Sequence, residues 1–196
     1  VLPILEKLGW DVFNPRFVLP EYSIGGGRVD YALFNSRGRA VIFVEVKMIG
    51  QIDGAERQLF EYAFHQGVPF LILTDGKEWN FYLPLQHGNY LDRKLNKFDL
   101  LENDPNVIVQ KLKKYLEFHR VDQGFALSDA ETDFKEISQS REAQIYLPIA
   151  WNSLLERHDG VIINLLIDKV ADLSGFRPDR ESCIQFLDNI GNFNIQ

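Results

Sequence analysis

Residues 28–47 contain the feature that most limits the possible folds of this chain, two strand-like segments joined by a turn. Their sequence is RVDYALFNSRGRAVIFVEVK. Residues 28–34 alternate in polarity, residues 35–38 are typical of a tight turn, and residues 39–47 are rich in β-branched and aromatic side chains. The segment therefore predicts an antiparallel hairpin whose second strand lies inside a sheet.

A helix and another strand are expected directly after this hairpin. Residues 51–66 place Ile52, Ala55, Leu59 and Ala63 at helical spacing. Residues 68–74 form a continuous apolar run, which is typical of a strand covered on both faces. A hairpin continued by a helix and a buried strand predicts the α/β class, with a mixed sheet flanked by helices.

The remaining patterns predict two domains, 1–120 and 121–196. In the first we expect helices over 1–9 and 105–119, an extended stretch over 17–22, a strand over 78–83 and an edge strand around Tyr90. In the second, a linker over 121–128 precedes helices over 129–157, 161–173 and 178–190. Pro148 is expected to break or kink the first of these helices. The second domain is thus a small helical module.

The composition is that of a globular protein, with 45% hydrophobic residues in a chain of 196. Cys183 is the single cysteine, so no disulfide can form within the chain, and we expect a reducing cytoplasm. The sequence contains no run of about 18 apolar residues and no recognisable secretory signal, so no membrane span is expected. Residues 1–120 carry 15 basic and 15 acidic side chains, whereas residues 121–196 carry 6 and 13. A neutral first domain is therefore compatible with binding nucleic acid.

Glu45 and Lys47 are two charged residues in an otherwise apolar strand. Burying such groups costs free energy unless they are paired or bind a metal. Because residues i and i+2 of a strand share a face, their side chains are expected to point together. The pair is therefore the first candidate for chemistry in this chain.

The hairpin register decides whether Asp30 joins this pair. A two-residue loop at positions 37 and 38 sets Asp30 opposite Glu45, and a loop at positions 36 and 37 sets it opposite Phe43, on the face of Glu45. A three-residue loop would break this arrangement. With either two-residue loop, two carboxylates and one ammonium lie on one patch.

Two neighbouring carboxylates repel each other unless a cation lies between them. Their hard oxygen atoms suit Mg²⁺ or Mn²⁺, so Asp30 and Glu45 are candidate metal ligands. Lys47 is positioned to orient an attacking water and to offset negative charge on a phosphate. Gln58 and Tyr62 are four residues apart and share a helix face, from which they are expected to contact a nucleotide.

Asp30, Glu45-x-Lys47 and Gln58-x-x-x-Tyr62 occur in an order that resembles the PD-(D/E)xK nuclease superfamily. The last motif is similar to that of RecB-like nucleases and of the N-terminal domain of type I restriction enzyme R subunits. Similarity to the R-subunit domain covers about residues 1–120, through the letters GWDVFNP, PEY, RVDYAL, VEVK and ILTDGKEW.

The resemblance implies a restriction-endonuclease-like core that cleaves DNA phosphodiester bonds with Mg²⁺. It implies Asp30 and Glu45 as metal ligands, Lys47 as the catalytic lysine, and Gln58 with Tyr62 as an accessory motif. Val29 stands where the superfamily has its proline, and the chain has no Walker A motif. Translocation along DNA therefore cannot be assigned to this chain, and restriction-modification or helicase subunits and a second copy of the chain are expected as partners.

Glu6 on the first expected helix and Glu21 in the proline-flanked stretch are further candidate ligands, the alternative for each being a solvated side chain. The leading hypothesis is a metal-dependent deoxyribonuclease. A second hypothesis is an inactive nuclease-fold module that binds nucleic acid or docks a partner protein. A third is a structural or assembly role of the acidic second domain.

Overall fold

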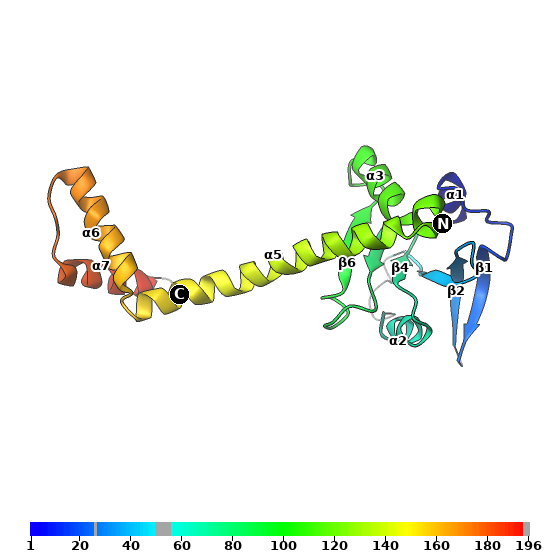
Figure 1. Ribbon diagram of the computed structural model, residues 1–196, viewed down its shortest axis with the longest axis horizontal. Helices are drawn as coiled ribbons and strands as arrows, with labels where there is room; N and C mark the ends of the chain where they lie inside the picture. The colour runs from blue at the N-terminus through cyan, green and yellow to red at the C-terminus, as the bar shows by residue number, and fades with distance from the viewer. Residues whose placement is uncertain (26, 50–55, 194–196) are drawn as a thin grey trace. The chain divides into compact units, whose positions relative to one another are not determined.

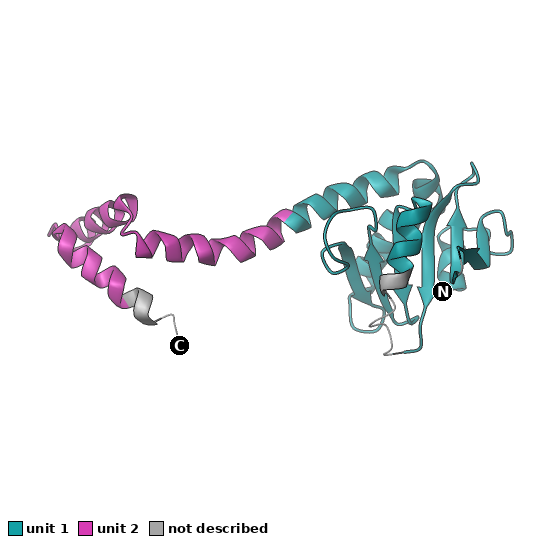
Figure 2. Cartoon of the chain, turned by 90° about the horizontal axis from the view of Figure 1, so that it is seen from below, with its two compact units in different colours: residues 1–138 teal, residues 139–196 magenta. Residues whose placement is uncertain are grey.

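The computed structural model describes residues 1–25, 27–49 and 56–193, without the side chains of residues 56–58 and 190–193. The chain forms two compact units, residues 1–138 and residues 139–196 (Figure 2). Each unit contains buried hydrophobic clusters of its own.

The first unit contains a six-stranded sheet in which the strands lie in chain order (Figure 1). The strands are β1 (Val18–Ile24), β2 (Gly27–Phe34), β3 (Ala40–Val46), β4 (Phe70–Thr74), β5 (Glu78–Tyr82) and β6 (Lys94–Asp99). All neighbouring pairs are antiparallel except β3 and β4, which are parallel and are connected through helix α2 (Glu56–Gln66). The expected α/β class with a mixed sheet is therefore confirmed, whereas residues 51–55 of the expected helix lie outside the described residues.

Helices cover both faces of the sheet. Successive side chains of a strand therefore pack alternately into two different buried clusters, one on each face. Ile42 and Val44 of β3 belong to one buried cluster, whereas Phe43 between them belongs to the other. The first cluster includes side chains from α1 (Leu2–Lys7), α3 (Pro105–Leu116), α4 (Phe118–Asp122) and the start of α5 (Phe125–Glu156). The second cluster is covered by α2. Strand β4 is fully buried because both of its faces are covered.

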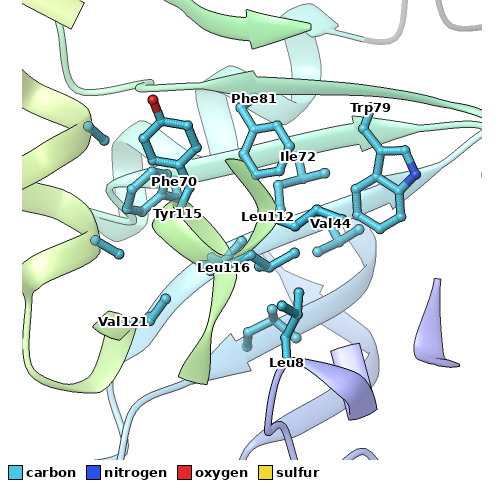
Figure 3. Close-up of a cluster of buried hydrophobic side chains, with 14 of the residues drawn as sticks. Leu8, Val44, Phe70, Ile72, Trp79, Phe81, Leu112, Tyr115, Leu116 and Val121 are labelled. Atoms are coloured by element: carbon cyan, nitrogen blue, oxygen red, sulfur yellow. The ribbon is translucent and has the colours of Figure 1, made fainter. Parts of the chain in front are cut away.

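The aromatic residues of β5 are buried and are divided between the two clusters. Trp79 and Phe81 are fully buried and lie with Leu112 and Leu116 of α3 (Figure 3). Tyr82 is also buried but belongs to the second cluster. These side chains are core residues rather than a platform for stacking bases.

Three expectations about element boundaries are wrong, and the break expected at Pro148 does not occur. The edge strand around Tyr90 lies later in the chain, as β6, and the expected helix over 105–119 ends at Leu116 because Glu117 adopts an extended conformation. The expected linker over 121–128 is mostly helical, as α4 and the first residues of α5. Pro148 lies inside α5 and does not end it. Proline leaves one backbone carbonyl of the preceding turn without a hydrogen-bond donor. The helix is exposed around Pro148, so water can hydrogen-bond to that carbonyl.

The first compact unit extends beyond residue 120 because the next residues complete its core. Val121, Ala126, Ala130 and Phe134 are all buried in the larger cluster. The last three recur every four residues, so they form one apolar stripe at the start of α5. The contacts therefore place the boundary between the units after Ser138.

The second unit contains the end of α5 and the helices α6 (Gly160–Ser174) and α7 (Arg180–Phe193), close to the expected helices. Asp159 caps α6 by accepting a hydrogen bond from the Val161 N–H. Cys183 is buried in a small cluster with Leu155, Ile163 and Leu187. In the described part of the chain, no helix combines the length and the apolar character needed to cross a bilayer.

Asp133 of α5 accepts hydrogen bonds from Lys114 and Tyr115 of α3. Partial burial alone would raise the pKa of Asp133, but the hydrogen bonds from Lys114 and Tyr115 hold it below the usual range. Burial, together with Asp133, raises the pKa of Tyr115, so the phenol keeps its proton and remains a donor.

We expect Asp133→Asn to lower the free energy of unfolding at pH 7 by about 1 kcal/mol, because one charged acceptor serves two donors and is partly solvated. A carboxyl with a lowered pKa stabilises the fold above the pKa of the unfolded chain, about 4, and this contribution disappears as the pH falls through the lowered value. Urea unfolding should therefore show the two proteins converging below about pH 4. Asp172→Asn, at an exposed position, is the control, and equal stabilities at pH 7 would contradict the expectation.

Candidate catalytic site

A bulge in the hairpin sets the register on which the candidate site depends. Tyr31 pairs with Val44 and Leu33 with Ile42, but Phe34 pairs with Ala40, so Val41 is an extra residue in β3. Both expected two-residue loops are therefore wrong, because residues 35–39 connect the strands. The bulge compensates for the longer loop, and the resulting register sets position 30 opposite position 45.

The turn itself is fixed by side chains. The Asn35 carboxamide oxygen accepts hydrogen bonds from the backbone N–H groups of Arg37 and Arg39, at 3.1 and 3.0 Å. Asp122 of α4 accepts from the Ser36 N–H at 2.7 Å. Hydrogen bonds from the side chain and backbone of Ser36 hold the pKa of Asp122 below its usual range, so this acceptor stays charged at neutral pH. A helix far along the chain thereby holds the turn in place.

Asp30 lies where β2 separates from β3. The paired residues end with Tyr31 and Val44, and the next backbone N–H that β3 directs toward β2 belongs to Val46. This N–H donates to Oδ2 of Asp30 at 2.6 Å. Val29 and Tyr31 contribute to core clusters on opposite faces of the sheet, so the regular alternation of β2 is interrupted at Asp30.

Glu45 and Lys47 point together, as residues two apart in a strand should. The Lys47 Nζ lies 2.6 Å from Oε1 of Glu45, with 31% and 16% of the two side chains exposed. The other carboxylate oxygen, Oε2 of Glu45, is buried and has no hydrogen-bond partner among the residues that the structure describes. An unpaired buried carboxylate oxygen is costly unless an ordered water, an ion or a ligand binds it.

The three residues meet through the backbone of β3. Val46, whose N–H binds Asp30, lies between Glu45 and Lys47 in the chain. Asp30 thus reaches the Glu45-x-Lys47 segment, although no hydrogen bond joins its carboxylate to either side chain in the described part of the structure.

Of the two additional acidic candidates, Glu21 lies beside Asp30 and Glu6 does not. A cavity of about 450 Å³ is lined by Asp30, Glu21, Val46 and the first residues of the chain. Glu21 has a φ of 51°, in the left-handed region, and its carboxylate lies 2.6 Å from Nε of Arg28. A non-glycine residue in this conformation carries backbone strain, which often accompanies functional sites. Glu6 is exposed on α1 and does not line the cavity.

The accessory motif is only partly described. Gln58 and Tyr62 both lie in α2, but the side chain of Gln58 is outside the described part of the structure. The ring of Tyr62 lies directly against the backbone of Gly27, where a Cβ would come within 1.7 Å of Oη. Gly27 begins β2 three residues before Asp30, so Tyr62 packs next to the candidate site.

The donor set at this site fits the Mg²⁺ or Mn²⁺ expected from the sequence. Within residues 1–25, 27–49 and 56–193, no group of three or more His, Cys, Asp or Glu side chains is arranged to hold a metal. Mg²⁺ keeps several of its water ligands, so a protein site for it needs few carboxylates. Because Oε2 of Glu45 is buried without a partner, the residues present fit a hard divalent cation.

No family model matches this chain, and no curated protein matches it either. Among solved structures, the chain is similar to the crystal structure of the type IIG restriction endonuclease BpuSI. The sequences are 14% identical, the match covers 68% of this chain and 16% of that enzyme, and the TM-score is 0.38. The assignment of a site therefore rests on the residues of this chain themselves.

We expect Gly27→Ala to displace the Tyr62 ring and to lower the free energy of unfolding by about 1–3 kcal/mol, as overpacking does. In a Tyr62→Leu background the same change should lower the free energy of unfolding by less, because the shorter leucine side chain does not reach the backbone of Gly27. Urea unfolding of the two single variants and the double variant measures this coupling. Gly160→Ala is the control, since its Cβ meets nothing within 4 Å. Additive effects of the two substitutions would contradict the described contact.

Proposed function

We propose that the first unit, residues 1–138, acts as a Mg²⁺-dependent endonuclease domain that hydrolyses DNA phosphodiester bonds, similar to the N-terminal domain of type I restriction enzyme R subunits. The observation that supports this most is the buried, unpaired Oε2 of Glu45 beside Lys47. A carboxylate in this state is suited to a cation, and an adjacent ammonium is suited to a phosphate.

Asp30 and Glu45 are the residues that would hold the cation. The hydrogen bond from Val46 fixes Oδ2 of Asp30 and leaves Oδ1 for a ligand. Once bound, a divalent cation supplies Lewis acidity and a more acidic water ligand.

Lys47 has the role of positioning the attacking water and stabilising negative charge. About one-third of its side chain is exposed and its ammonium is held by Oε1 of Glu45, so the ammonium has further protons to donate to a water molecule and to a phosphate oxygen. Tyr62 and Gln58 of α2 would contact the nucleotide next to the cleaved bond. DNA translocation is not part of the proposal, because the sequence contains no Walker A motif.

A second candidate function is a module that binds nucleic acid or a partner protein without cleavage. The Lys47–Glu45 ion pair favours it, because the pair satisfies one carboxylate oxygen in the absence of a cation. Under this hypothesis, binding is expected to survive EDTA and no cleavage is expected.

The test of the proposed nuclease compares cleavage of plasmid and single-stranded DNA with Mg²⁺ or Mn²⁺ by the full chain and its variants. We expect Asp30→Ala and Lys47→Ala to lower the rate by about a hundredfold or more, because each removes a group that acts on the reacting phosphate. Glu6→Gln, on the exposed face of α1, should cleave like the wild type.

Calorimetry with Mn²⁺ tests the cation site separately. The wild type should bind Mn²⁺, and Glu45→Gln should weaken this binding at least about tenfold, because the variant lacks the charged oxygen ligand. Cleavage by all variants at equal rates, or Mn²⁺ binding that is indifferent to Glu45, would exclude the proposed mechanism.

A further inference from the structure

A second cavity lies at the opposite end of the hairpin from the candidate catalytic site. It has a volume of about 380 Å³ and is enclosed by the β2–β3 turn, the start of β4 and the junction of α4 with α5. Five residues of extended chain separate Arg39, on the rim, from Glu45, at the end of β3. The six steps from Arg39 to Glu45, at about 3.3 Å per residue, span about 20 Å, so the cavity is not part of the catalytic site.

Two exposed arginines, Arg37 and Arg39, lie at the rim of this cavity. Neither guanidinium forms a direct ion pair with another residue in the described ranges, although the charge of Arg37 helps to lower the pKa of Asp122. Their backbone N–H groups are held by the Asn35 side chain, so the turn presents both guanidinium groups from a fixed backbone. Asp122 also lines the cavity, but its carboxylate already accepts hydrogen bonds from Ser36 and Gln123.

The remainder of the lining is largely apolar. Phe70 and Val121 are buried core residues, and the half-buried side chains of Val41 and Leu127 complete this part of the wall. A concave apolar surface with a few fixed polar groups at one side is the usual form of a small-molecule site. The volume lies toward the lower end of the range for such sites, about 300–1,000 Å³, and is too small for a DNA duplex.

We propose that this cavity binds a small organic phosphate, a nucleoside monophosphate or a group of that size, with its phosphate on Arg37 and Arg39 and its less polar body against Val41 and Leu127. Guanidinium groups bind phosphate oxygens through paired hydrogen bonds, which an exposed lysine would not reproduce. The same chemistry exists in a free nucleotide and in the 5′-phosphorylated end of a DNA strand.

Isothermal titration of the full chain with AMP, adenosine and inorganic phosphate, in EDTA, tests the proposal. AMP should bind, and adenosine and phosphate should each bind at least about tenfold more weakly, because each lacks one half of the ligand. The Arg37→Gln/Arg39→Gln variant should bind AMP at least about tenfold more weakly than the wild type. Arg16→Gln, an exposed arginine outside the cavity, is the matched control and should bind AMP as the wild type does.

Three outcomes would each overturn the proposal: the wild type shows no saturable AMP binding, the double variant binds AMP as tightly as the wild type, or adenosine binds as tightly as AMP. Binding that is retained in Asp30→Ala would support a site separate from the catalytic residues, whereas its loss there would overturn that separation. Competition by a 5′-phosphorylated oligonucleotide, but not by its unphosphorylated form, would support the proposal and identify a strand end as the source of the ligand. If AMP binding depends on the two arginines but the 5′-phosphorylated oligonucleotide does not compete, the result would support the proposal and identify a free nucleotide as the source of the ligand.

Discussion

The hydrogen bond from the Val46 N–H to Asp30 is the interaction on which the candidate site depends. It forms where β2 separates from β3, and it replaces a backbone partner with a carboxylate. Because Val46 lies between Glu45 and Lys47, the same bond brings the third residue of the motif to the other two. The separation of the two strands thus leaves the Val46 N–H without a backbone partner, and the Asp30 carboxylate takes that place.

The residues at which β2 and β3 separate are set by the turn and the bulge at the other end of the hairpin. The extra residue Val41 compensates for a turn longer than two residues, since a shift of one residue would turn every side chain of β3 to the opposite face relative to β2. Asp122 of α4 binds the turn at Ser36. A contact between residues 86 positions apart therefore supports the register of the motif.

The two ends of the hairpin differ in charge, and this difference separates the two proposed ligands. At the end of β3, carboxylates with an unpaired oxygen favour a cation. At the turn, Arg37 and Arg39 favour an anion beside an apolar wall. The same hairpin, packed between two helical layers, thus carries groups of opposite charge at its two ends.

The sequence alone determined the hairpin, the buried strand β4 and the pairing of Glu45 with Lys47, because these depend on local periodicity and on the alternation of strand side chains. It also placed most helices of the second unit, where Gly175 and Pro178 mark ends and starts. Only the tertiary structure decided the bulge at Val41, the contact of Tyr62 with Gly27 and the burial of Val121 in the first unit. Each of these depends on which distant surfaces meet, and the free energy of such packing is not encoded in the pattern of any one segment.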